Sequence, residues 1–409
     1  MKGMDNPLTE EELAQIEQPI AAARTLPRRA FYDEGIYEFE VENMLARTWL
    51  AIAFSEHVPR AGDVSPMTVL GRPLLLVRNR SGGLNIFHNV VPYDGSEVAI
   101  KAATGLEQIV TPYHGLVYDL DGGAIAAPFW NGTPAGASPP DARLHLRRLR
   151  CEEWFGTVFV NLSGGAEPFE VYLRPVADYF MGYRLDRLHI GKDEESKAII
   201  HDLKCRANWK TMYENYSPNV YHESFVHDMY RRSPHSPRVD AHGRKTYSEI
   251  VDPRGFLGLC YDNRIADGIY GPRSPLPPIL LNDGRANPTN TIVNMYPNWV
   301  ITMLHNQARI AFMLPEGPEC CTQFIANFFD ESAAAPELAE DRRTSWRAGV
   351  KARTEDNLVC ESIQRARHSP GVQTQFFNTF WDTPHWVLTR MFARRYREAC
   401  RPPGGGANP

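Results

Sequence analysis

The stretch from about Ala51 to Leu162 constrains the fold most, because short apolar runs alternate there with turn residues. Pro73 leads into an apolar run, and Ser81-Gly82-Gly83 separates that run from the next one. Short strands divided by glycine-rich turns are typical of a small all-β domain. We therefore predict a β domain over residues 51–165, with strands near residues 74–77, 84–91, 108–111, 116–120 and 154–162.

Helical patterns lie on both sides of this β block. Thr9 and Glu12 fit a capping box, and a second short helix is predicted over residues 33–50, ending at Trp49. Residues 1–50 are therefore predicted to form an N-terminal helical segment. Residues 336–367 are charged with apolar positions at helical spacing, and Pro384 suits the first position of a C-terminal helix capped by Thr383. Antiparallel strands are expected over Thr291 to Met313 and Cys321 to Phe329, long loops over 231–290, and a disordered tail over 401–409. The predicted class is α+β, with residues 166–400 as the second domain.

Charge and cysteine usage exclude several classes of protein. The net charge of -5 and the pI of about 6.2 disfavour a nucleic-acid or anionic-membrane surface. Apolar runs stay below the roughly 18 residues of a membrane span, and no signal-peptide pattern is present, so the expected location is the cytoplasm. The seven cysteines include no C-x-x-C pair, which disfavours a disulfide framework or a thiolate zinc site, and the first of them is Cys151.

The aromatic segment Asn208–His227 carries two histidines, His222 and His227, five positions apart. Neutral imidazole is a common ligand of iron, zinc and copper. Five residues of regular α-helix turn about 500°, which would point the two side chains roughly 140° apart. If both bind one metal, the segment must bend, end or widen between them, and Pro218 just upstream is consistent with irregular backbone. Two structural histidines are the alternative.

Three segments together resemble the catalytic α subunits of Rieske-type non-haem iron oxygenases. Asn89 to Gly95 reads NVVPYDG where the family has N-x-C-P-H-R-G, and Thr111 to Asp119 reads TPYHGLVYD where it has C-P-Y-H-G-W-x-Y-D. The third segment is Asn208–His227, where the family has Asn-Trp-Lys, Glu-Asn and D-x-Y-H-x4-H. The similarity runs over roughly residues 25–395. It implies a Rieske-like β domain followed by a helix-grip (START/SRPBCC-like) domain, in which an antiparallel sheet wraps a long C-terminal helix.

The β domain departs from this family at the cluster ligands. A Rieske [2Fe–2S] centre needs two cysteines on one iron and two histidines on the other. The four corresponding positions hold Val91, Tyr93, Thr111 and His114, which offer no thiolate and one imidazole. We expect this domain to fold without a [2Fe–2S] centre, with His114 kept as part of a turn.

For the second domain, the resemblance implies one Fe(II) held by His222, His227 and Asp356. Asp356 lies in an acidic stretch, Thr354 to Gln364, that is similar to the family's late helix. The alternative for this stretch is a solvated charged face, since Glu355 and Glu361 are also acidic.

Two asparagines complete the expected site. The family has an acid in place of Asn219, and in its trimers that acid links one subunit's cluster to the next subunit's iron; Asn219 keeps the shape but not the charge. Asn215, like Asn208, is expected either to support the site or simply to cap a helix.

Three functions remain open from the sequence. The first is an oxygenase subunit that uses O2 to hydroxylate, dihydroxylate or oxidatively demethylate a small organic substrate. Its electrons would come from a Rieske-bearing paralogous subunit in a mixed trimer, or from a ferredoxin or reductase. The second is a non-catalytic partner or regulatory subunit of such a complex. The third is redox-neutral chemistry, such as hydrolysis by metal-activated water.

Overall fold

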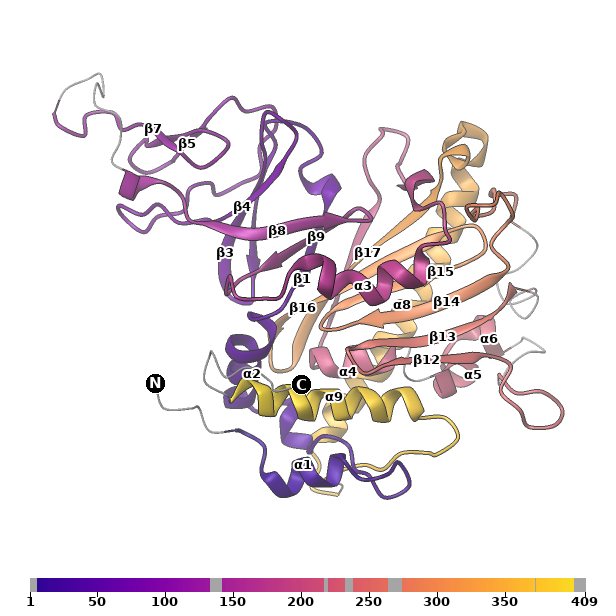
Figure 1. The fold of residues 1–409 in the computed structure, drawn as a ribbon. Coiled ribbons are helices and arrows are strands. Elements are labelled where there is room, and N and C mark those ends of the chain that lie inside the picture. The colour runs from indigo at the N-terminus through magenta and orange to yellow at the C-terminus, as the bar shows by residue number, and fades with distance from the viewer. Residues whose placement is uncertain are drawn as a thin grey trace. The chain divides into compact units, whose positions relative to one another are not determined.

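The computed structural model describes residues 6–132, 142–216, 220–231, 238–263, 274–371 and 373–400. The chain divides into two compact units, Ala46–Phe169 and a larger unit made of Met1–Leu45 with Glu170–Pro409 (Figure 1). The N-terminal helices are therefore part of the larger unit rather than a separate segment. Contacts with later parts of the chain hold these helices, because the buried Glu40 carboxylate pairs with Lys210 and Arg397 binds both Glu10 and Glu17.

The smaller unit contains two antiparallel sheets. The six-stranded sheet has the order β1-β9-β8-β4-β3-β2, and the three-stranded sheet has the order β5-β6-β7. Their bounds are β1 (Leu50–Phe54), β2 (Val64–Val69), β3 (Arg72–Arg78), β4 (Leu84–His88), β5 (Ile109–Val110), β6 (Val117–Tyr118), β7 (Ala124–Ala126), β8 (Arg148–Trp154) and β9 (Thr157–Asn161).

The core of the smaller unit forms where apolar residues of the strands and turns meet. Leu75 and Val77 of β3 pack with Phe87 of β4 and with Tyr118 of β6. Val91, which follows β4, belongs to the same buried cluster. The apolar runs therefore form strands because each buries its side chains against a neighbouring strand.

The larger unit is built on an eight-stranded antiparallel sheet. Its order is β10-β17-β16-β15-β14-β13-β12, with β11 also paired to β17. The bounds are β10 (Leu188–Ile190), β11 (Ile200–Cys205), β12 (Ser248–Asp252), β13 (Phe256–Asp262), β14 (Thr289–Met295), β15 (Trp299–Met303), β16 (Ala308–Gly317) and β17 (Cys320–Asp330).

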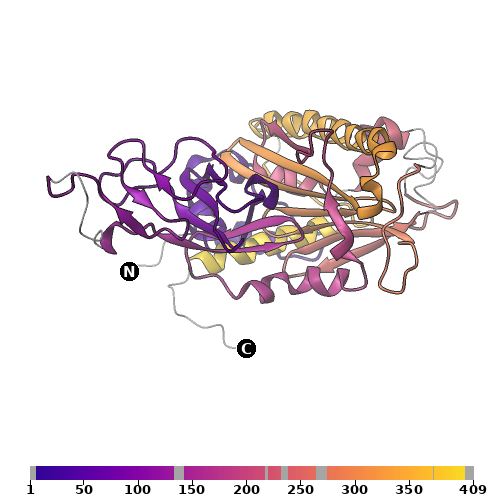
Figure 2. The ribbon, with the colours of Figure 1, turned by 90° about the horizontal axis from the view of Figure 1, so that it is seen from above.

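Helices cover this sheet and carry the candidate site. Figure 2 shows α8 and α3 on opposite sides of the sheet. The predicted α+β class is confirmed by this arrangement. The main helices of the unit are α1 (Glu10–Ile16), α2 (Glu34–Glu40), α3 (Phe169–Phe180), α4 (Trp209–Asn215), α5 (Glu223–Val226), α6 (Asp228–Arg231), α8 (Ala339–Arg367) and α9 (Thr383–Ala399).

Three local predictions were wrong. Residues 231–290 are not loops throughout, because β12 and β13 pair over residues 248–262 and bury Leu257 and Leu259. α2 ends at Glu40 and continues as a π-turn over Val41–Leu45 instead of running to Trp49. α9 is preceded by Asp382, with Thr383 already inside the helix.

The predicted tail 401–409 lies outside the described residues. Among the helices described, none is both long and apolar enough to cross a membrane.

An ion pair at the end of β17 makes stability depend on pH. Both nitrogens of the Arg187 fork bind the buried Asp330 carboxylate, at 2.9 and 3.0 Å, and Ser332 donates to the same group. Burial raises the pKa of Asp330, but Arg187 and Ser332 outweigh it and lower that pKa to about 2. A carboxyl group whose pKa is lower in the folded protein than in the unfolded chain stabilises the fold at pH values above its unfolded pKa, which is near 4. This stabilisation is lost as the pH falls through the folded pKa.

Asp330→Asn is therefore expected to lower the free energy of unfolding by about 2 kcal/mol at pH 7 and by about half as much at pH 3. Urea denaturation of both proteins at the two pH values measures this difference. Asp283→Asn is the matched control, because Asp283 pairs with Arg285 on the surface, where such pairs contribute little. If Asp330→Asn lowers the free energy of unfolding by as much at pH 3 as at pH 7, the ion pair with Arg187 is not the source of this pH dependence.

Candidate metal centre

The segment that carries the two histidines is irregular, as its spacing requires. Asn208 caps α4, since its side chain accepts a hydrogen bond from the Lys210 N–H at 2.9 Å. A 3-10 turn over Val220–His222 leads into the single turn of α5, which His227 follows as the C-cap. His227 has extended backbone angles, φ −91° and ψ 119°, before α6 begins. The prediction that regular helix cannot run through both histidines is confirmed.

His222, His227 and Asp356 converge on one point. One ligand atom from each residue lies within 4.8 Å of the others. The Nε2 atoms of the two histidines are both 3.3 Å from Oδ1 of Asp356. Asp356 is 2% exposed and comes from α8, more than one hundred residues further along the chain. The tertiary fold therefore brings together all three residues predicted as ligands.

Arg353, one turn before Asp356 on α8, orients its carboxylate. The Arg353 guanidinium binds Oδ2 of Asp356 at 3.1 Å and lies 4.1 Å from the centre of the Tyr216 ring. Oδ1 is left facing the histidines, buried and without a hydrogen-bond partner of good geometry among the described residues. Burial raises the pKa of Asp356, but the imidazoles of His222 and His227 and the charge of Arg353 hold it well below its usual range.

Glu355 and Tyr230 position His227. Oε2 of Glu355 is 3.0 Å from Nδ1 of His227, which directs Nε2 toward Asp356. The Tyr230 ring packs against the imidazole with ring centres 5.6 Å apart. Burial lowers the pKa of His227, but the carboxylates of Asp356 and Glu355 outweigh it and raise that pKa. A carboxylate behind a metal-binding imidazole is the usual support for such a ligand.

The donor set fits ferrous iron. Two imidazole nitrogens and one carboxylate oxygen form the ligand set of the facial triad that non-haem Fe(II) oxygenases use. The buried Oδ1 atom, which faces both Nε2 atoms without a well-formed hydrogen bond, is what a shared cation would require. Zinc accepts a similar set of ligands, so the donor atoms alone do not choose between the two metals.

The other residues considered for this site have different surroundings. Asn215 ends α4 and is buried, and its Nδ2 atom has no hydrogen-bond partner among the described residues. Asn219 lies outside the described residues. Glu361 accepts a hydrogen bond from the Arg206 N–H at 3.0 Å, away from the histidines. Sequence reasoning missed Arg353 and did not give Glu355 its role, although both lie within one helical turn of Asp356.

The four positions expected to have lost the cluster ligands lie around two turns of the smaller unit. Val91 is fully buried in the apolar core, whereas Tyr93 is 55% exposed. Thr111 is buried, and its hydroxyl has no hydrogen-bond partner among the described residues. His114 is partly exposed, and its Nδ1 atom binds Oδ2 of Asp94 at 2.5 Å. The single imidazole among these four positions is therefore already bound to a carboxylate.

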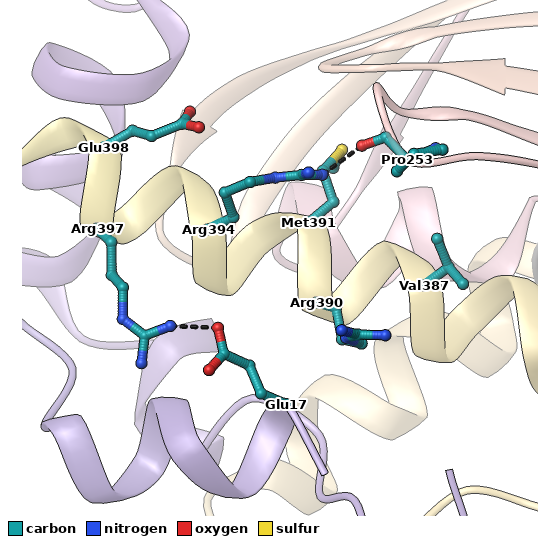
Figure 3. A pocket seen from close by; sticks show the side chains of 8 residues that line it. All are labelled: Glu17, Pro253, Val387, Arg390, Met391, Arg394, Arg397 and Glu398. Atoms are coloured by element: carbon teal, nitrogen blue, oxygen red, sulfur yellow. Dashed lines mark hydrogen bonds and ion pairs between the residues drawn. The ribbon is translucent and has the colours of Figure 1, made fainter. Parts of the chain in front are cut away.

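A pocket of about 410 Å³ lies beside α9, and none of the predicted metal ligands lines it (Figure 3). The guanidinium of Arg397 binds Glu17, and that of Arg394 donates to the Pro253 carbonyl. Arg390 stacks over Trp386 at 4.7 Å. The lining arginines are thus bound by other groups of the chain, and the pocket is separate from the three metal-ligand candidates.

Two family models match the chain. Residues 185–401, more than half of the 409 residues, match the ring hydroxylating alpha subunit (catalytic domain). Residues 48–135 match the Rieske [2Fe-2S] domain.

Curated relatives agree with these matches. The biphenyl 2,3-dioxygenase subunit alpha of Rhodococcus jostii is 27% identical over 48% of this chain and 42% of its own length. The carnitine monooxygenase oxygenase subunit of Escherichia coli is 29% identical over 47% of this chain and 50% of its own. The match therefore spans about half the length of these two relatives. The anthranilate 1,2-dioxygenase large subunit of Burkholderia cepacia is 24% identical over 80% of this chain and 79% of its own.

Solved structures share the fold at lower identity. A quaternary ammonium Rieske monooxygenase has a TM-score of 0.74 and 20% identity, covering 95% of this chain and 99% of its own. Naphthalene 1,2-dioxygenase from Rhodococcus sp. has a TM-score of 0.72 and 16% identity, covering 95% and 97%. With a Rieske-type β unit, followed in the chain by an antiparallel sheet whose covering helices and turns carry the two histidines and the aspartate, the chain belongs to the ring-hydroxylating oxygenase α-subunit family.

Proposed function

We propose that this chain is a mononuclear non-haem iron oxygenase subunit that receives its electrons from outside the chain. The observation that carries the proposal is the convergence of His222, His227 and Asp356 in a chain with no cysteine at either cluster turn. When bound, Fe(II) would supply the redox chemistry that lets O2 hydroxylate, dihydroxylate or oxidatively demethylate a small organic substrate.

The residues around the centre have separate tasks in this proposal. His222 and His227 would hold the iron through Nε2, and Asp356 through Oδ1. Arg353 binds the second oxygen of Asp356, so the carboxylate presents one atom to the metal. Glu355 fixes the orientation of His227 through Nδ1. Asn215, whose buried amide nitrogen has no hydrogen-bond partner among the described residues, is proposed to support the site, and Asn219 to form a hydrogen bond across a subunit interface.

The smaller unit does not fit a [2Fe–2S] centre. Two thiolates and two imidazoles are required, and Val91 and Thr111 stand at the thiolate positions. Cys151 on β8 is the one cysteine of this unit, and its thiol donates to the Leu84 carbonyl at 3.6 Å. Burial raises the pKa of Cys151 to about 11, so it remains protonated. We infer that the unit folds without a cluster.

Without its own electron relay, the chain would need a partner. A Rieske-bearing paralogous subunit in a trimer or other hetero-oligomer, or a ferredoxin or reductase, would deliver the two electrons that O2 activation requires. The net charge of -5 supports neither nucleic acid nor an anionic membrane as a partner.

Oxygen consumption tests this function. The iron-loaded chain would be incubated with biphenyl, carnitine or anthranilate, the compounds that name its relatives, alone and with a reduced Rieske protein as electron source. We expect substrate-dependent oxygen uptake only when that electron source is present, and background uptake with His222→Ala. Substrate-dependent oxygen uptake at the full rate by the isolated iron-loaded chain, with no electron source added, would contradict the need for a donor.

His222→Ala also distinguishes this function from the alternative, a non-catalytic partner subunit, which the altered cluster positions support as well. In that case the native complex isolated with His222→Ala would keep full activity. Turnover in strictly anaerobic buffer without a reductant would instead indicate redox-neutral metal chemistry.

A further inference from the structure

Arg238 is a buried cation that the sequence analysis did not single out. It begins a short hairpin ahead of β12, where the Thr246 N–H donates to the Arg238 carbonyl at 3.1 Å and Val239 pairs with Lys245. Its side chain is 4% exposed, and its Nε atom donates to the buried carboxylate of Glu223. The backbone of the hairpin and this ion pair together fix the position of the guanidinium.

The outer edge of this guanidinium is not used by the chain. Both terminal nitrogens of Arg238 are buried and have no hydrogen-bond partner among the described residues. The ring of Tyr261 lies 3.9 Å from the guanidinium carbon and covers its face, but the N–H groups point outward in the plane. A buried donor left without a partner is energetically unfavourable, so the N–H groups of these two nitrogens call for an acceptor.

This unused edge lies next to the proposed metal ligands. Glu223, which binds Arg238, directly follows His222 in the chain. Tyr230 touches both groups, because its ring packs on His227 and lies 5.3 Å from the Arg238 guanidinium carbon. Tyr230 therefore lies between Arg238 and His227, and the ion pair with Glu223 connects Arg238 to the residue that follows His222 in the chain. A group bound to it would lie beside the metal centre.

The charge and geometry of this site select the ligand. Two parallel N–H donors from the end of a guanidinium match the two oxygens of a carboxylate. Glu223 already places one negative charge against Arg238, which favours a singly charged anion over a phosphate dianion. The buried hydroxyls of Thr246 and Tyr247, also without a hydrogen-bond partner among the described residues, offer further polar contacts near the hairpin.

We propose that Arg238 binds the substrate of the metal centre and that this substrate carries a carboxylate group. The proposal rests on the proposed function, because it assigns the substrate class of the same site. It makes Arg238 a specificity residue and Glu223 its positioning partner. A neutral isostere of the substrate would leave the buried guanidinium edge unpaired and would bind more weakly.

Calorimetric titration with benzoate and with the neutral isostere benzamide tests this assignment. We expect the wild-type chain to bind benzoate at least about tenfold more tightly than benzamide. Arg238→Lys keeps the charge but loses the fork, and Arg238→Met loses both. Each is expected to abolish the preference for benzoate and to leave benzamide binding unchanged. Arg187→Lys, which alters an arginine paired with Asp330 in the same unit, is the control expected to keep the preference.

Circular dichroism and iron content are measured on the same samples. If Arg238→Met fails to fold, the relative affinities of Arg238→Lys for benzoate and benzamide test the proposal. Equal affinities of the wild-type chain for benzoate and benzamide, or a full benzoate preference in folded Arg238→Lys, would overturn the inference. Iron binding without a benzoate preference refutes only the inference. A benzoate preference that depends on Arg238 in a chain that binds no iron would support the anion site and refute the proposed function.

Discussion

Asp356→Ala is expected to remove iron from the chain and to reduce oxygenase activity to background. Oδ1 of Asp356 lies 3.3 Å from both imidazole Nε2 atoms and is the carboxylate donor among the three converging atoms. Loss of a residue that only supports a metal ligand typically costs 10–100-fold in metal affinity, so loss of the ligand itself should cost more than about 100-fold. Titration with Fe(II) under anaerobic conditions measures the affinity.

Two neighbours on α8 serve as controls for this variant. Glu355→Gln removes the charge behind His227 and is expected to weaken iron binding by about 10–100-fold. Glu361→Gln alters a carboxylate that faces Arg206 and should leave iron binding unchanged. If Glu361→Gln or Glu355→Gln abolishes iron binding while Asp356→Ala retains it, the assignment of Asp356 as the carboxylate ligand is wrong.

The largest effect on stability is expected from Glu40, the last residue of α2. Its carboxylate accepts from the Lys210 ammonium at 2.6 and 2.7 Å and from the Trp209 indole at 2.9 Å, and the Tyr396 hydroxyl also donates to it. Glu40 and Lys210 are both fully buried. Burial lowers the pKa of Lys210, and Glu40 opposes that effect. Glu40 thus joins the N-terminal helices to α4 and α9.

Glu40→Ala would leave the Lys210 ammonium buried without its counter-charge, and breaking a buried pair in this way costs about 3–5 kcal/mol. Urea denaturation measures the loss. Glu38→Ala is the matched control, because Glu38 is exposed on the same helix and should change stability by no more than about 0.5 kcal/mol. The double variant Glu40→Leu with Lys210→Met should recover much of the loss, since an apolar pair of similar size often replaces a buried ion pair without cost. A loss below about 1 kcal/mol in Glu40→Ala would contradict this role.

The sequence predicts the metal ligands better than their surroundings. His222, His227 and Asp356 stand at positions that the family pattern specifies, and the turn of an α-helix already requires a break between the histidines. Arg353 was within reach, because residues three or four apart share a helix face, whereas Glu355 directly precedes Asp356 and contacts His227 instead. Their partners could be inferred only once Asp356 and His227 were known to meet.

Long-range contacts account for what the sequence did not reveal. Glu40 reads as one of several acids in a short helix, and its burial depends on Lys210 and Tyr396, which are 170 and 356 positions away. Arg238 lies in a polar stretch that resembles a loop, and the strands that follow it, β12 and β13, join the sheet through pairing of β13 with β14. Local pattern carries no information about such partners.

Iron and acid-labile sulfide, measured per chain on protein purified under anaerobic conditions, test the central claim most directly. The account predicts about one iron per chain, no sulfide, and no visible absorption of an iron–sulfur centre. Sulfide in proportion to additional iron, with a [2Fe–2S] spectrum, would contradict it, because the chain would then carry its own electron relay.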